Sequence, residues 1–69
     1  MRTYARYGEK IKRIRRERDV SQEQLAEQAS VDPKTIIEIE GGKRANPTLR
    51  TLNKISRALK VRLENFLSS

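Results

Sequence analysis

Residues 21–44 decide the fold, and they read SQEQLAEQASVDPKTIIEIEGGKR. Ser21 is followed three residues later by Gln24, the capping-box pattern in which each side chain bonds the backbone N–H of the other residue at the start of a helix. Asp32 and Pro33 give a second start, because the carboxylate can accept from a free N–H and proline is well tolerated at the first helical position. The stretch therefore predicts two helices in close succession.

The second of these helices is predicted to stop at Gly41-Gly42, since glycine weakens a helix and readily adopts the left-handed conformation that ends one. Only Ser30-Val31 separates the two helices. Apolar residues recur at helical spacing on one side of each helix, so this side is predicted to face the core. The predicted core residues of the pair are Leu25, Ala26, Ala29, Val31, Ile36 and Ile39.

Helical periodicity continues on both sides of the pair. Upstream, Tyr7, Ile11 and Ile14 place an apolar stripe on a basic helix that is predicted to end near Asp19. Downstream, one apolar stripe predicts a fourth helix and a last apolar group predicts a short fifth. The stripe comprises Leu49, Leu52, Ile55, Ala58 and Leu59, and the last group comprises Leu63, Phe66 and Leu67. The predicted fold class is all-α, with residues 1–69 forming a single domain.

The composition argues against several classes of function. The 69 residues include no cysteine and no histidine, so a disulfide framework and the usual zinc, haem and iron–sulfur ligand sets are missing. No Ser-His or Cys-His catalytic pair can be assembled either. We therefore expect no enzymatic activity, no cofactor, no metal and no small-molecule ligand.

The charge balance favours a polyanionic partner. Sixteen basic and nine acidic side chains give a net charge of +7 and a pI near 10.4. Residues 19–40 are acidic while both flanks are basic, so attraction to phosphate is expected to come from the flanks. Apolar runs are far shorter than the roughly 20 residues of a membrane span, and the N-terminus lacks the apolar part of a signal peptide. We expect a cytoplasmic protein with no membrane partner.

Two helices joined by a tight turn form the helix-turn-helix arrangement, whose second helix enters the roughly 12 Å wide major groove of DNA. Ala26 is small enough to let the two helices approach, and Val31 can fill the turn from the inside. The outer side of the second helix carries Pro33, Lys34, Ile37, Glu38 and Gly41. A solvated surface of mixed charge is the competing interpretation of each single charged residue there.

Three motifs in this order resemble the Cro/repressor (XRE) helix-turn-helix family. They are the Ser-Gln-x-x-Leu-Ala opening at Ser21, the Ile-x-x-Ile-Glu-x-Gly pattern from Ile36, and Asn-Pro-Thr-Leu from Asn46. The resemblance begins upstream at Ile11 and extends to Val61. It implies a compact five-helix, lambda-repressor-like domain that binds double-stranded DNA, typically as a homodimer on a palindromic operator.

The resemblance also implies roles for individual residues. Contacts to base edges are implied for Pro33, Lys34, Ile37 and Glu38. Contacts to the DNA backbone are implied for Ser21, Gln22, Thr35, Gly41, Lys43, Arg44 and Thr48. Among the base contacts, Lys34 can donate to guanine O6 and N7, Glu38 can accept from cytosine N4, and Ile37 can pack on a thymine methyl group. Ordinary solvent-exposed side chains are the alternative interpretation.

Two structural features follow from the same resemblance. Arg15 on the first helix and Glu40 at the end of the third are expected to form a partly buried ion pair. Asp19, Ser30 and Lys60 stand where the family usually has glycine. Two outcomes are open at each: φ > 0 at a cost on the order of 1 kcal/mol, or a turn shifted toward right-handed geometry.

The apolar group Leu63, Phe66 and Leu67 is more than so short a chain can bury, so part of it is expected to form a two-fold dimer contact. The alternative is that these residues only cap the core. Two functions stay open at this point. One is a DNA-binding transcriptional regulator of the repressor or controller type, and the other is an antitoxin-like or adaptor module whose helix-turn-helix mainly holds a protein partner.

Overall fold

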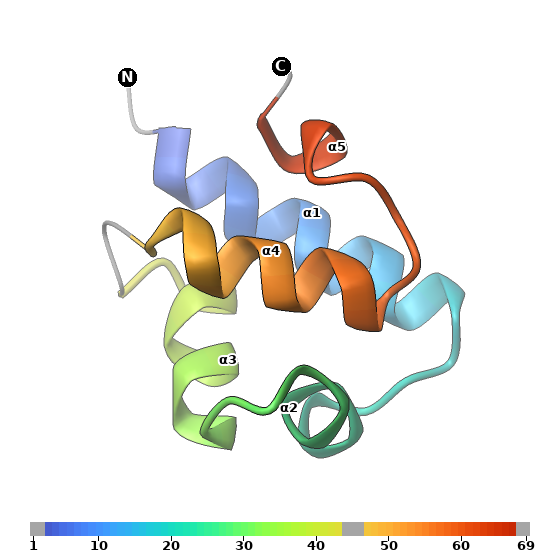
Figure 1. The fold of residues 1–69 in the computed structure, drawn as a ribbon. Coiled ribbons are helices and arrows are strands. Elements are labelled where there is room, and N and C mark those ends of the chain that lie inside the picture. Colours follow the sequence, from blue (N-terminus) through green and yellow to red (C-terminus); the bar gives the residue numbers. More distant parts are fainter. Residues whose placement is uncertain (1–2, 44–46, 68–69) are drawn as a thin grey trace.

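The computed structural model describes residues 3–43 and 47–67, which form five α-helices (Figure 1). In chain order these are α1 (Thr3–Glu17), α2 (Gln22–Ala29), α3 (Pro33–Glu40), α4 (Leu49–Ala58) and α5 (Glu64–Leu67). The predicted all-α fold class and the order of the helices are confirmed. None of the described helices is both long enough and apolar enough to cross a membrane.

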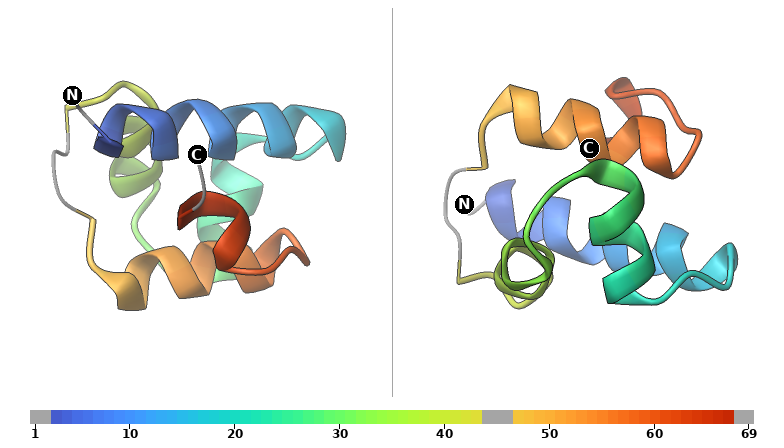
Figure 2. Two further views of the ribbon diagram at one scale, coloured as in Figure 1. Left: turned by 90° about the horizontal axis from the view of Figure 1, so that it is seen from above. Right: turned by 60° about the horizontal axis from the view of Figure 1, so that its bottom comes forward.

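The helices surround one core. Helices α1 and α4 run along two sides of the molecule, and α5 lies between them in the view from above (Figure 2). Helices α2 and α3 close the side opposite to α5 (Figure 1). Helix α1 packs against α3 and α5, while α2 packs against α3 and α4. The α2–α3 pair therefore rests on α1 and α4.

Every helix contributes at least one side chain to the core. The buried apolar residues are Ile11, Ile14, Leu25, Ala26, Ala29, Ile36, Ile39, Leu52, Ile55, Leu59 and Phe66. Full burial of one leucine or isoleucine stabilises a fold by about 1.5–3 kcal/mol, so these stripes are the main source of stability. Ser56 is also buried, and its hydroxyl donates to the Asn53 carbonyl at 2.8 Å, which satisfies the one polar group of this side chain.

Both predicted helix starts are present. Ser21 Oγ accepts the N–H of Gln24 at 3.0 Å, and Gln24 Oε1 accepts the N–H of Ser21 at 2.8 Å, which completes the capping box. Asp32 Oδ1 accepts the N–H of Lys34 at 2.8 Å, with Pro33 at the first position of α3. Such a cap typically stabilises a helix by about 1 kcal/mol. These local bonds fix where α2 and α3 begin.

Three helices end in the same way. Asp19, Ser30 and Lys60 follow α1, α2 and α4 with φ values of 59°, 58° and 61°, so the left-handed alternative holds at all three. Each is followed by a valine whose N–H bonds a carbonyl five residues earlier. These bonds run from Val20 to Arg15 (3.0 Å), from Val31 to Ala26 (2.9 Å) and from Val61 to Ser56 (2.9 Å). All three valines pack against the core, as the hydrophobic contact of this helix-ending motif requires.

Two apolar residues differ from their expected positions. The spacing of Leu49 predicts burial, but its side chain is 62% exposed at the first position of α4. Phe66, expected to share in a dimer contact, is only 1% exposed and belongs to the core. This corrects the expectation for Phe66, since a buried ring offers no surface to a second chain. Leu63 is half-buried against the core, and the side chain of Leu67 lies outside the described part.

Gly8 marks a close approach of α1 to the end of α3. A Cβ at this position would collide with the carbonyl oxygen of Ile39 and would lie 3.1 Å from the Cα of Glu40. Both are backbone atoms of a packed helix, so they cannot rotate away as a side chain can. Gly8 therefore lets α1 lie directly against the end of α3 that carries Glu40.

Candidate nucleic-acid interface

Two of the three isoleucines of α3 are buried in the core, and the third is exposed. Ile36 is fully buried and Ile39 is 1% exposed, whereas Ile37 is 53% exposed. Lys34 precedes Ile37 by three residues and Gly41 follows it by four, so the three share one face of the helix. The α3 outer face, as we call this surface, comprises Pro33, Lys34, Ile37, Glu38 and Gly41.

The residues predicted to contact bases all belong to the α3 outer face. Pro33 and Lys34 are exposed at the start of the helix, and Glu38 is half-buried. Among the described residues, only carbonyl oxygens of α3 itself, those of Ile37 and Glu38, lie within 4 Å of a Cβ built at Gly41. The described part of the chain therefore leaves this face uncovered at its far end as well.

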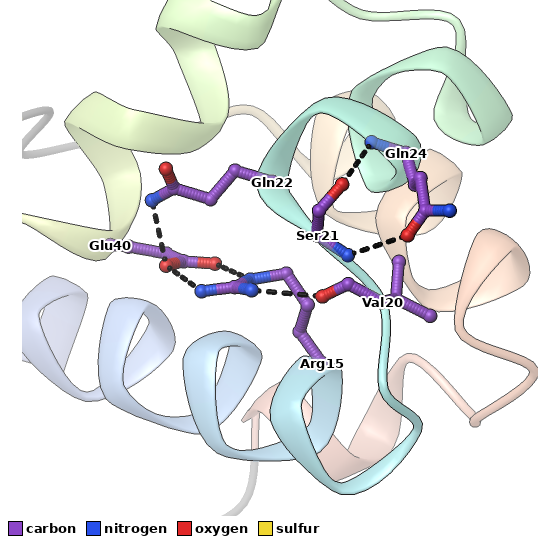
Figure 3. Close-up of polar contacts among 6 residues, drawn as sticks. All are labelled: Arg15, Val20, Ser21, Gln22, Gln24 and Glu40. Atoms are coloured by element: carbon purple, nitrogen blue, oxygen red, sulfur yellow. Dashed lines mark hydrogen bonds and ion pairs between the residues drawn. The ribbon is translucent and has the colours of Figure 1, made fainter.

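The N-terminal end of α2 lies beside the C-terminal end of α3 (Figure 3). Gln22, the first residue of α2, is half-buried, and its Nε2 donates to Glu40 Oε1 at 3.1 Å. The family resemblance implies a DNA-backbone contact for Gln22, and no sequence pattern indicates its bond to Glu40. The first N–H groups of a helix also carry the positive end of its dipole, so this end of α2 suits a phosphate group.

Arg15 and Glu40 form the ion pair that the family resemblance implies. Arg15 Nε lies 2.7 Å from Glu40 Oε2, and Nη2 donates to Oε1 at 3.0 Å (Figure 3). The remaining nitrogen, Nη1, donates to the carbonyl of Val20 at 2.9 Å. The two charged side chains are 10% and 3% exposed, so water screens them little. The carboxylate of Glu40 thus links the end of α3 to α1 through Arg15 and to the start of α2 through Gln22.

The hydrogen bond with Glu40 raises the pKa of Arg15 above its usual value, against a smaller opposing effect of burial. A raised pKa of a basic group adds stability that is fully present below the pKa of the unfolded chain and is lost only as pH rises through the folded-state value. Both values lie far above neutrality for arginine. Titration of Arg15 therefore does not weaken the pair near neutral pH.

The other residues predicted to contact the DNA backbone lie on α3, just beyond its end and at the start of α4. Thr35 is half-buried on the helix, and Lys43 is exposed just beyond its end. Thr48 is exposed and caps α4, where its Oγ1 accepts the N–H of Thr51 at 3.1 Å. Arg44 lies outside the described residues. Lys43 brings a positive charge just beyond the C-terminal end of α3, and Thr48 stands at the positive N-terminal end of α4, so each is suited to a phosphate group.

Two basic side chains make contacts that no sequence pattern indicates. Just beyond α1, Arg18 donates from Nε to the Leu59 carbonyl at the end of α4, at 2.7 Å. Within α1, Lys10 Nζ donates to the Asn65 carbonyl of α5 at 3.2 Å. Each contact joins residues more than forty positions apart, so neither leaves a local signal. Part of the positive charge in and just after α1 therefore contributes to packing between helices.

Comparison with known families agrees with this geometry. A family model described as a helix-turn-helix domain matches residues 8–68, which include all five helices except the start of α1. The chain belongs to this helix-turn-helix family. In its terms, α2 and α3 are the paired helices, and the turn is the segment at Ser30 and Val31.

Individual relatives of this helix-turn-helix domain include regulators of different lengths. The control protein C.MunI of a Mycoplasma species is 42% identical over 64 residues, which cover 91% of this chain and 85% of that protein. The chain spans 45% of the length of the first curated relatives that it matches, two HTH-type transcriptional regulators of Bacillus subtilis.

Two solved structures have the same fold. The restriction-modification controller protein C.AhdI from Aeromonas hydrophila superposes with a TM-score of 0.87 at 25% identity, over 91% of this chain and 94% of that one. The biofilm master regulator SinR, solved in complex with DNA, gives a TM-score of 0.86 at 34% identity, over 90% of this chain and 98% of that one. The predicted five-helix architecture is confirmed by both.

Proposed function

We propose that this helix-turn-helix domain is a sequence-specific DNA-binding transcriptional regulator of the repressor or controller type, active in the cytoplasm and without a catalytic step. The observation that carries the proposal is the α3 outer face. A short capped helix is fixed to the core by Ile36 and Ile39 and exposes Lys34 and Ile37 on its outer side, which suits insertion into the major groove. The SinR complex with DNA and the control protein C.MunI support this assignment.

Direct reading of bases falls to the α3 outer face in this proposal. Lys34, exposed near the start of the helix, donates to guanine O6 and N7. Glu38, one turn further on, accepts from cytosine N4. The start of α2 at Gln22 and the residues around the end of α3, Lys43 above all, bind phosphates and set the register. The net charge of +7 favours approach to the DNA.

A two-fold dimer on a palindromic operator completes the proposal, with half-sites about one helical turn apart. Leu63, half-buried on the core, and Leu67 are the residues proposed for the contact between the copies. Analytical sedimentation at a chain concentration on the order of tens of micromolar is expected to show a dimer. A monomer both with and without DNA would contradict this part of the proposal.

Salt dependence separates DNA binding from the alternative, an antitoxin-like or adaptor module. The test measures binding of the chain to a random double-stranded DNA pool at several salt concentrations and then sequences the retained molecules. For a DNA-binding regulator, log K falls linearly with log salt, by about 0.9 for each phosphate contacted, and a palindromic motif is enriched. Weak binding that is indifferent to salt and enriches no motif would favour a protein partner.

A further inference from the structure

Ile37 is the one strongly exposed isoleucine on a helix whose other two isoleucines are buried. Among the described residues, it and Leu49 are the exposed large apolar side chains, and Leu49 is on α4. Single exposed apolar residues are common on protein surfaces, so exposure alone carries no conclusion. The location of Ile37 is informative, because Ile37 shares its face of α3 with Lys34 and directly precedes Glu38.

The edges of the base pairs in the major groove offer little to an aliphatic side chain. Guanine, adenine and cytosine present hydrogen-bond donors and acceptors there, whereas thymine also presents its C5-methyl group. The side chain of Ile37 can neither donate nor accept a hydrogen bond. Against a polar base edge it would remove water from groups that it cannot pair, and this is unfavourable. Against a thymine methyl group it would bury apolar surface on both partners.

We propose that Ile37 reads one thymine in each half-site by packing against its 5-methyl group, beside the bases contacted by Lys34 and Glu38. This inference rests on the proposed function and adds the identity of a base that hydrogen-bonding side chains do not specify. It makes Ile37 a specificity-determining residue.

Atomic deletion on the DNA side tests the inference. The motif enriched from the random pool is resynthesised with uracil in place of each thymine in turn, which removes a single methyl group and keeps the base pair. For the unaltered chain, replacing thymine by uracil at one position of the half-site is expected to lower the affinity about fourfold. This corresponds to about 0.8 kcal/mol for one buried methyl-sized group. Placing 5-bromouracil there, with bromine where the methyl group was, is expected to restore affinity.

Two variants assign the effect to the side chain. Ile37→Ala is expected to bind the thymine and uracil forms of this site equally, because the side chain that detects the methyl group is gone. Leu49→Ala, the matched control at the other exposed apolar residue, is expected to keep the fourfold difference. Both side chains are more than half exposed, so the melting temperatures of both variants should stay close to that of the unaltered chain.

Two kinds of result overturn the inference. In the first, replacing any thymine of the motif by uracil lowers the affinity of the unaltered chain by no more than about twofold. The other is an Ile37→Ala variant that still loses the same factor as the unaltered chain. Either result overturns the role of Ile37 and leaves the proposed function standing. If the pool yields no motif at all, the proposed function and this inference fail together.

Discussion

Arg15 Nε lies 2.7 Å from Glu40 Oε2, and this ion pair joins the last turn of α1 to the last residue of α3. Gln22 shares the same carboxylate, so the start of α2 is tied to the same point. The orientation of the α3 outer face therefore depends on contacts made on the opposite, buried side of the helix pair.

Removing one charge of this pair should be costly. Arg15→Met leaves the carboxylate of Glu40 buried without its cation, and we expect a loss of about 3–5 kcal/mol in the free energy of unfolding. Urea denaturation followed by circular dichroism measures it. The double variant Arg15→Met with Glu40→Leu removes both charges and should recover much of the loss. A loss below about 1 kcal/mol in the single variant would mean that the pair behaves like one on the surface.

A methyl group at Gly8 should destabilise the fold even though alanine is the better helix former. The added Cβ meets the backbone of Ile39 and Glu40, so α1 or α3 must move, and we expect Gly8→Ala to cost about 1–3 kcal/mol. Lys12→Ala, at an exposed position of the same helix, is the control and should change stability by less than about 0.5 kcal/mol. Equal or higher stability of Gly8→Ala would show that the two helices can separate at no cost.

Glycine at the left-handed helix ends should have the opposite effect. Lys60 has φ of 61°, and Lys60→Gly is expected to raise the free energy of unfolding by about 0.5–1 kcal/mol, because strain is relieved although the unfolded chain gains freedom. Lys60→Ala keeps the strain and should bring no gain. Asp19→Gly should gain less, since aspartate tolerates this conformation better. Thermal unfolding of the three variants ranks them, and a fall in stability for Lys60→Gly would contradict the argument.

Local signals account for what the sequence could predict. The capping box at Ser21, the cap at Asp32 and the proline after it each depend on a few neighbouring residues, and all lie where they are expected. The three non-glycine helix ends follow from the family resemblance instead. The contacts of Gly8 with α3 and of Arg18 with Leu59 depend on how distant helices pack, so no local pattern reveals them.

Packing between distant helices also explains why Leu49 and Phe66 differ from their expected positions. Helical spacing places Leu49 on the buried side of α4, but spacing cannot tell how far the core extends along the helix. Phe66 was equally compatible with a core cap and a dimer contact, and only the packing of α5 against α1 decides for the core. The ion pair of Arg15 with Glu40 came from the family resemblance, since no local pattern predicts it.

Phosphate contacts should be recognisable by their salt dependence. Lys43, exposed just beyond α3, is proposed to bind the DNA backbone, so Lys43→Ala should weaken binding to all sequences alike and reduce the salt slope by about one unit. Arg44→Ala is expected to act in the same way. Binding isotherms on one selected and one scrambled duplex provide the measurement. Loss confined to the selected duplex would mean that Lys43 reads bases.

The central claim is that the α3 outer face reads the DNA, and selecting sites from one random pool with the unaltered chain, Lys34→Ala and Lys43→Ala tests it most directly. We expect Lys34→Ala to change the preferred base at one or two positions of the half-site, with a loss of about 1–3 kcal/mol there, while Lys43→Ala selects the original motif more weakly. An unchanged motif for Lys34→Ala together with an altered motif for Lys43→Ala would contradict the assignment of α3 as the reading helix.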